Sequence, residues 1–309
     1  MNPLLARHLY SSARRNRFFV LLSLYLLGVG ILTLLFTLLT SLPVIFEETT
    51  TISMLDLFTQ GRALYWFSSV ILLLTAGGLV PINALGALAG ERENHTLDLL
   101  VTTTLKTHKI ILGKAGAALL TGAVYVLAPL PLLMMGFWLG GVTSIELLLT
   151  LLFLILTMLL SIMWAIYISS ITRKTIAAVI VFYGVNLGLI PIMIVVATML
   201  VGLYDRWQYV SSIAIQPMWI ETLIQYGWVL LAGLHPLSAA ISTEVLGMEQ
   251  ASWFWLHFSV ERFDSTTGTT ALLGTATLPS PWIVYTATAI ITILCLFWMT
   301  TRRLRQPER

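Results

Sequence analysis

The feature that most constrains this chain is a series of apolar runs, each about twenty residues or longer and almost free of charge. A helix rises about 1.5 Å per residue and the hydrocarbon core of a bilayer is about 30 Å thick, so about 20 apolar residues cross it. Charged residues make up 10% of the 309 positions and hydrophobic residues 58%. This balance is typical of integral membrane proteins. We therefore predict an all-α, polytopic membrane protein.

Six runs are long enough to form transmembrane helices. They cover about residues 18–40, 64–89, 115–139, 147–171, 175–203 and 282–301. Because six is an even number, both ends of this 18–301 transmembrane domain should face the same side. The longest connections are a charged inner loop, 90–114, and an outer segment, 204–281, and the chain ends in a basic tail, 302–309.

The positions of Lys and Arg predict the orientation, because these residues favour cytoplasmic segments. With both termini in the cytoplasm, all but three of the 17 Lys and Arg fall on the inner side; the exceptions are Arg62, Arg206 and Arg262. The net charge of +3 is then a topology signal. A nucleic-acid partner would need a soluble basic patch, and the sequence contains none. The lipid bilayer is the expected surrounding of the chain.

Residues 1–17 are expected to lie on the inner leaflet as an amphipathic connecting helix. Leu5, Leu9, Ser12 and Ala13 fall on one helical face. The basic residues fall mostly on the other face, as in interfacial helices, and they are Arg7, Arg14, Arg15 and Arg17.

The outer segment 204–281 contains an ambiguous hydrophobic stretch, 211–235. It includes Glu221, and a glutamate in the middle of a bilayer is costly. We therefore expect 211–235, and a shorter helix at 237–247, to be re-entrant or interfacial helices in this last outer loop. Residues 265–277 are rich in Thr and Gly and indicate a loop.

The predicted spans lack ionisable groups near their centres. Ion-coupled carriers usually place such groups at membrane depth, so energy for transport would have to come from elsewhere. The most polar central residues either bond to neighbouring helices or line a substrate path, for which Asn83 and Asn186 are the candidates, beside Thr157 and Ser161. The chain also lacks catalytic motifs, metal-ligand motifs and a phosphate-binding loop, so we expect no cofactor and no enzyme activity in this chain alone.

The inner loop reads GERENHTLDLLVTTTLKTHKIILGK from residue 90 to residue 114. Leu97, Leu100 and Val101 have helical spacing and predict a short apolar stripe. Glu93 and Asp98 lie towards the start of this helix, where the helix dipole favours acids. A helix of about two turns is unstable alone, so it needs a surface on which to dock.

The residues of this loop resemble a family signature. Gly90–Leu105 and Leu112–Lys114 are similar to the G-E-R-E-x-x-T-L-E-L-L-L-x-T-P-L…L-G-K pattern of permease subunits of type-2 ATP-binding-cassette (ABC) exporters. Asp98 stands where glutamate is usual, and Thr104 stands where proline is common. The opening Asn2–Arg7, followed by Arg14-Arg15, resembles the N-terminal connecting helix of the same family.

This resemblance implies a permease of a prokaryotic cytoplasmic membrane, coupled to a separate ATPase subunit that binds ATP and magnesium. Two permeases, either the same chain twice or two related chains, would pair with two ATPases. The inner loop would supply the coupling helix that docks into the ATPase. The residues expected to couple are Glu91, Arg92, Glu93, Thr96, Leu97, Asp98, Leu100 and Val101.

Two alternatives remain open at this point. A membrane scaffold or assembly subunit would use the same inner helix to hold a partner without transport, and a neighbouring gene for an ATPase would argue against it. An intramembrane redox or enzymatic subunit would use His235 and His257, and a haem spectrum or bound metal would support it.

The topology is tested with cysteine substitutions at Thr107 and Thr267, in a chain whose native Cys295 is replaced by serine. We expect the two positions to react with an impermeant thiol reagent from opposite sides of oriented vesicles. Labelling from the same side would contradict the six-span topology and favour 211–235 as a further crossing.

Overall fold

The computed structural model describes residues 16–46, 54–96, 107–211, 218–250, 252–264 and 269–305. These residues are mostly helical and include six helices that are long and apolar enough to cross a membrane. The six cover Phe18–Leu42, Met54–Glu93, Thr107–Leu127, Ser144–Ile171, Thr175–Val196 and Pro281–Leu304. The predicted all-α, six-span membrane protein is therefore confirmed. The predicted connecting helix, with Arg7, Arg14 and Arg15, lies outside the described residues, and Arg17 lies in the first turn of the helix Asn16–Phe46, directly before the first span.

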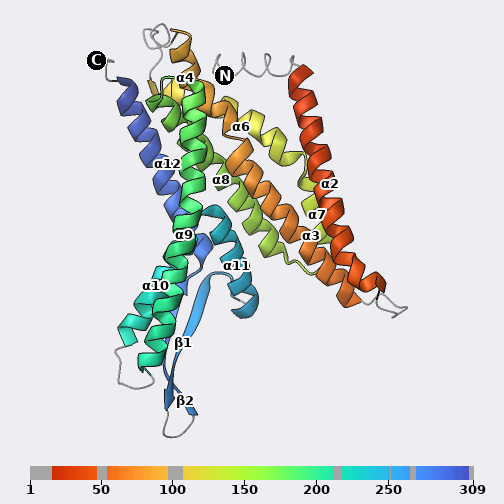
Figure 1. The fold of residues 1–309 in the computed structure, drawn as a ribbon, viewed down its shortest axis with the longest axis vertical. Coiled ribbons are helices and arrows are strands. Elements are labelled where there is room, and N and C mark those ends of the chain that lie inside the picture. The colour runs from red at the N-terminus through yellow and green to blue at the C-terminus, as the bar shows by residue number, and fades with distance from the viewer. Residues whose placement is uncertain are drawn as a thin grey trace. The chain divides into compact units, whose positions relative to one another are not determined.

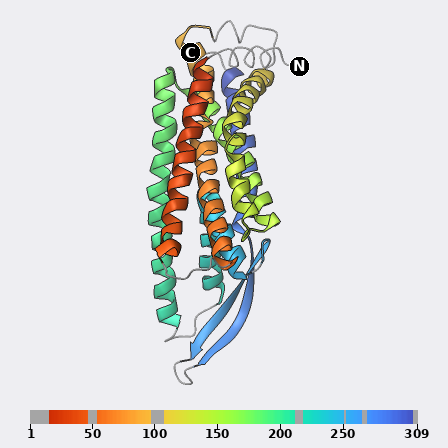
Figure 2. The same cartoon turned by 90° about the vertical axis from the view of Figure 1, so that its right-hand side faces the viewer.

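The chain divides into two compact units, and the first contains Met1–Phe182 and Ile290–Arg309. In this unit the long helices run side by side (Figures 1 and 2). Its elements are α2 (Asn16–Phe46), α3 (Met54–Leu74), a π-helical turn η1 (Thr75–Leu79), α4 (Ile82–Glu93), α6 (Thr107–Leu127), α7 (Leu130–Trp138), α8 (Ser144–Ile171), the start of α9 (Thr175–Ser211) and the end of α12 (Pro281–Arg305).

The second span is longer than predicted, because α3, η1 and α4 form one 40-residue run from Met54 to Glu93. Its N-terminal part includes Arg62, whose Nη2 lies 3.1 Å from Glu146 Oε1 on α8. The Glu146 side chain is 2% exposed and also caps the start of α8 together with Thr143. This pairing neutralises both charges, so the helix continues through Arg62 into a segment that the sequence predicts as an outer loop.

The middle of this span is broken at η1. Pro81 has no N–H to donate, and the Val80 N–H donates five residues back to the Thr75 carbonyl at 3.0 Å. Two neighbouring helices bond to the altered turn: Ser161 Oγ donates to the Ala76 carbonyl at 2.8 Å, and Tyr25 Oη lies 2.9 Å from Thr75 Oγ1. Ser161 therefore bonds to a neighbouring helix, which is one of the two roles expected for it.

The third predicted span, 115–139, is wrong at both ends. The helix α6 begins at Thr107 and ends at Leu127, and α7 starts after Pro129 as a separate short helix. Lys114, which was expected in the inner loop, lies inside α6 because a partner on α4 neutralises it. The helix α6 ends at Leu127 because Pro129 and Pro131 lack the N–H that a continuous helix needs.

Glycine allows α3 and α7 to pack closely. A Cβ atom on Gly136 of α7 would lie 2.8 Å from the Tyr65 backbone nitrogen, and one on Gly61 of α3 would lie 2.7 Å from the Gly140 carbonyl oxygen. Tyr65 is fully buried at this contact, and its hydroxyl lies 2.6 Å from Thr150 Oγ1 on α8. The N-terminal half of the second span is thus fixed against α7 and α8.

The second unit, Tyr183–Ala289, combines helices with a β-hairpin. It contains the rest of α9, the helices α10 (Met218–Leu234) and α11 (Pro236–Gln250), the strands β1 (Trp255–Asp264) and β2 (Thr269–Pro279), and the start of α12. The strands are antiparallel, with Trp255 opposite Pro279 and a register shift after Val260. Val229, Leu256 and Leu278 form its buried core.

This unit confirms two predicted helices and corrects one predicted loop. The stretches 211–235 and 237–247 contain α10 and α11, and their depth in a membrane stays a prediction. Residues 265–277, predicted as a loop, largely belong to β2. Threonine is common in turns, but as a β-branched residue it also favours strands, and pairing with β1 decides in favour of the strand.

The close packing of α3 and α7 predicts an asymmetric response to alanine at two glycines. Gly136→Ala should lower the free energy of unfolding by about 1–3 kcal/mol, because the new methyl group meets rigid backbone. Gly184→Ala is the matched control, because a Cβ atom placed there would meet no neighbouring atom within 4 Å. Unfolding in detergent measures both, and equal stability of the two variants would contradict the packing.

Candidate functional site

The charged residues of the G-E-R-E motif lie in the last turn of α4. Glu93 was expected near the start of a separate inner helix; instead α4 continues to Glu93 and ends there. The Thr96 N–H donates to the Glu91 carbonyl at 2.9 Å and the His95 N–H to the Arg92 carbonyl at 3.1 Å. With His95 at φ 55°, these bonds form a Schellman motif, which terminates a helix. Thr96 is thus a capping residue of α4.

Glu91 pairs with a lysine on α6. Its Oε1 lies 2.6 Å from Lys114 Nζ, and the two side chains are 29% and 9% exposed. Lys114 Nζ also donates to the Ala87 carbonyl one turn earlier on α4. A nearly buried ammonium needs such partners, because burial of an unpaired charge is costly. This ion pair joins the end of α4 to the third turn of α6.

Arg92 bonds to the end of α8. Its Nη1 donates to the Thr172 carbonyl at 2.9 Å and to the Ser170 carbonyl at 3.3 Å. The last carbonyls of a helix have no partner within the helix and carry its negative dipole end. The guanidinium donates to these carbonyls and places a positive charge beside the negative dipole end. Arg92 therefore fixes the end of α8 against α4.

Glu93 bonds to the start of α9. The N–H of Thr175 donates to Glu93 Oε2 at 3.2 Å, and the Thr175 hydroxyl donates to the same oxygen at 3.1 Å. A carboxylate at a helix N-terminus accepts from a free N–H and is favoured by the helix dipole. Ser169 adds a further link, because its buried Oγ accepts from the N–H groups of Leu88 and Ala89 on α4.

We call Glu91, Arg92, Glu93 and their partners Lys114, Ser170, Thr172 and Thr175 the helix-end cluster. It joins α4 to α6, α8 and α9, one charged side chain for each neighbour. Each of these three charges bonds within the chain, and the expectation that they also contact a partner protein stays a prediction. Sequence reasoning did not identify Ser170, Thr172 and Thr175, because no pattern in the sequence marks them as partners of the motif.

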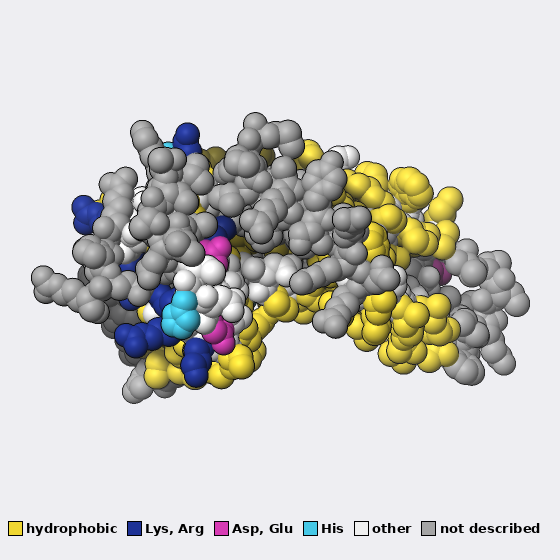
Figure 3. All heavy atoms as spheres, turned by 90° about the horizontal axis from the view of Figure 1, so that it is seen from above, with side chains coloured by type: hydrophobic (Ala, Val, Ile, Leu, Met, Phe, Trp, Pro, Cys, Tyr) yellow, Lys and Arg dark blue, Asp and Glu magenta, His cyan; other side chains and the backbone are white. Residues whose placement is uncertain are grey.

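Exposed charges surround the helix-end cluster. Seen from above, the visible Lys, Arg and His side chains of the described residues gather on one part of the surface with some of the acidic ones, beside hydrophobic side chains (Figure 3). The exposed members near the ends of α4, α6, α8, α9 and α12 are His95, Lys109, Arg173, Lys174, Arg302 and Arg303. The excess of positive charge fits a surface that faces anionic headgroups or an acidic partner.

The predicted apolar stripe follows the helix-end cluster directly in the chain. Leu97, Asp98, Leu100 and Val101 lie outside the described residues, so their role stays a prediction. The described chain stops at Thr96, three residues after the end of α4, and resumes at Thr107, where α6 begins. A force that acts on residues 97–106 is therefore transmitted first to α4 and α6, because these helices precede and follow the segment in the chain.

The two asparagines expected to line a substrate path lie in different compact units. Asn83 is exposed near the start of α4, two residues after Pro81, whereas Asn186 is half-buried on α9. The structure does not join them into one site within either unit. Asn83 stays a candidate because it lies beside the break in the second span.

Both histidines of the enzymatic alternative lie in the second unit. His235 joins α10 to α11, and its Nδ1 accepts from the Leu237 N–H at 3.3 Å. Burial lowers the pKa of the His235 imidazole below its ordinary value, which favours the neutral form that can accept. His257 is exposed on β1. Among the described residues, no group of three or more His, Cys, Asp or Glu could hold a metal ion.

Comparison with protein-family models found no match, and comparison with curated proteins also found none.

The helix-end cluster predicts that a single substitution at Glu91 destabilises the transmembrane domain. Glu91→Gln should lower the free energy of unfolding by about 2 kcal/mol, the contribution of a partly exposed charge-assisted bond, because Lys114 loses its counter-ion. Replacing both residues by leucine should recover most of this loss, because no unpaired charge remains. Denaturation in mixed micelles measures the effect.

The control for this experiment is Arg173→Gln, which removes an exposed charge near the same end and should change stability little. A Glu91→Gln variant as stable as the Arg173→Gln variant would contradict the role given to the ion pair.

Proposed function

We propose that this chain is the permease subunit of an ATP-driven ABC transporter, an exporter in the cytoplasmic membrane of a prokaryote with both termini in the cytoplasm. The observation that carries the proposal is the helix-end cluster. The resemblance to the family signature, the six spans and the predominance of bases on one side support it further.

The proposed mechanism starts at residues 97–106, which dock on the ATPase through Leu97, Leu100 and Val101. ATP binding closes the ATPase dimer and displaces this segment. Glu91, Arg92 and Glu93 then pass the displacement to α6, α8 and α9, because each of these helices is bonded to α4 by at least one charged group. The connected helix ends therefore move together. The displacement of one short segment by the ATPase in this way moves several helices of the bundle.

The break at η1 supports this proposal, because a moving span needs a place to bend. π-helical turns and proline weaken the helix locally and often occur at functional positions. The break lies between the helix-end cluster at Glu91–Glu93 and the ion pair of Arg62 with Glu146. We propose that the inner half of the second span pivots at Thr75–Pro81 while the outer half stays packed against α7.

The partner subunit supplies the chemistry. ATP and magnesium bind to the ATPase, and this chain contributes no catalytic group. A second permease copy, or a related chain, completes the transporter. Spans without central charge favour an amphipathic or lipid-like substrate over a small ion.

The coupling proposal is tested with the double variant Leu97→Asp, Leu100→Asp. Two unpaired carboxylates in an apolar groove are costly, so we expect the permease to insert normally but to lose its ATPase in copurification. The matched control is Leu99→Asp with Thr103→Asp, which places the same two charges on the opposite face of the predicted helix and should keep the ATPase bound.

Three readouts separate the outcomes: membrane insertion, ATPase copurification and ATPase rate in proteoliposomes. Loss of the ATPase in the stripe variant alone supports the proposal. Equal retention in both variants contradicts the docking role of the stripe. A wild-type complex that holds a partner without ATP hydrolysis would favour a scaffold instead.

A further inference from the structure

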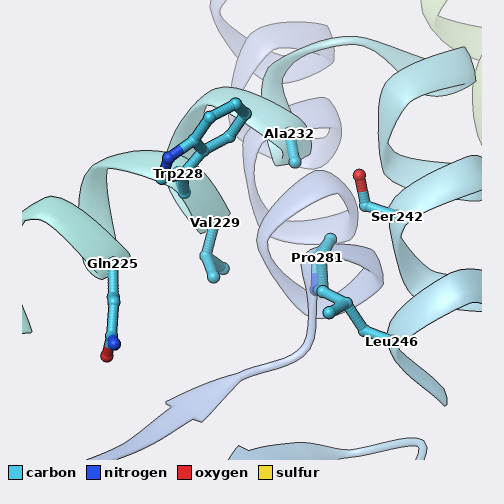
Figure 4. A pocket seen from close by; sticks show the side chains of 7 residues that line it. All are labelled: Gln225, Trp228, Val229, Ala232, Ser242, Leu246 and Pro281. Carbon is cyan, nitrogen blue, oxygen red and sulfur yellow. The ribbon is translucent and has the colours of Figure 1, made fainter. Parts of the chain in front are cut away.

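The second unit contains a cavity that the proposed transport mechanism does not use. Its volume is about 320 Å³, which is at the lower end of the range for small-molecule sites and much larger than one water. It lies between α10, α11 and the first residue of α12 (Figure 4). Its apolar lining consists of Trp228, Val229, Ala232, Leu246 and Pro281.

The lining follows from helical spacing. Gln225, Trp228, Val229 and Ala232 occur at i, i+3, i+4 and i+7 on α10, so they share one helical face. Ser242 and Leu246 occur four residues apart on α11. Gly233, next to Ala232, lets α12 approach α10, because a Cβ atom there would lie 2.5 Å from Val284 Cγ1. The cavity is therefore a product of how these helices pack within one unit.

One polar group in this lining lacks a partner. Gln225 is 8% exposed, and its buried Oε1 accepts no hydrogen bond from the part of the chain that the structure describes. Figure 4 shows Gln225 and Val229 extending from the same side of α10. A buried carbonyl oxygen without a donor is unfavourable and uncommon. The site therefore calls for a ligand that brings an O–H or N–H group.

The lining also defines the rest of the ligand. It contains no Asp, Glu, Lys, Arg or His among the described residues, and burial of an ionised group without a counter-charge is costly, so a charged headgroup fits poorly. The apolar side chains fit an aliphatic chain. Two polar side chains, Gln225 and Ser242, are too few to hold a cluster of waters in a cavity of this size.

We propose that this cavity is a binding site for a neutral, single-chain amphiphile, whose hydroxyl or amide N–H donates to Gln225 and whose aliphatic chain lies against Val229, Ala232 and Leu246. The inference concerns binding alone and does not depend on the proposed transport function. A failure of ATPase coupling would leave it unaffected.

The test uses 1-dodecanol that carries a photoreactive diazirine on its chain, with the full-length protein in detergent and in lipid nanodiscs. Labelled peptides are mapped by mass spectrometry. We expect labelling on residues 225–232 and 242–246. Unlabelled 1-dodecanol should compete about fivefold better than dodecane, the factor expected for one neutral hydrogen bond.

Two variants and a control make the test specific. Gln225→Leu should keep the labelling but remove the preference for the alcohol. Leu246→Trp fills the cavity and should reduce labelling at least about tenfold. Leu230→Trp adds the same ring on a 53% exposed position of α10 outside the lining and should leave labelling unchanged.

Labelling in detergent as well as in nanodiscs supports a ligand taken up from solution, whereas labelling only in nanodiscs supports one taken from the bilayer. Either result agrees with the site. Undiminished labelling in the Leu246→Trp variant overturns the proposal, as does equal competition by dodecane and 1-dodecanol in the wild type.

Discussion

Three consecutive charged side chains at the end of α4 fix the ends of three other helices, and the organisation of the first unit depends on them. Each side chain makes a different contact. Glu91 neutralises Lys114, Arg92 donates to the last carbonyls of α8, and Glu93 accepts from the first N–H of α9. Helix ends carry unpaired backbone groups and partial charges. Arg92 and Glu93 satisfy such groups on α8 and α9 directly.

The other end of the same unit is fixed in a related way, and the middle of the second span is not regular helix. Arg62 pairs with the buried Glu146, which also belongs to the capping box of α8. Between these two anchored ends, η1 and Pro81 interrupt the i to i−4 bonding, and Ser161 bonds to the Ala76 carbonyl that the break leaves available. Anchored ends around an interrupted centre make bending at the centre easier than loosening of the ends.

The sequence predicted the helical class and the six spans, because about twenty apolar residues in a row have few alternatives. It misplaced ends wherever a charge had a tertiary partner: Arg62, Lys114 and Glu93 lie inside helices because Glu146, Glu91 and Thr175 pair with them. The hairpin was missed because threonine occurs in turns and strands alike. The partners of Arg92 were unpredictable, since Ser170 and Thr172 contribute only backbone carbonyls, which any residue has.

Hydrogen exchange of the full-length protein in lipid nanodiscs, followed by mass spectrometry, tests the helix-end cluster most directly. The wild type is compared with a variant in which Glu91, Arg92 and Glu93 are all replaced by glutamine. We expect faster exchange in the variant at three separate places, the start of α6, the end of α8 and the start of α9, with unchanged exchange at the start of α8 near Glu146. Unchanged exchange at all three places, or an equal increase along the whole chain, would contradict this expectation.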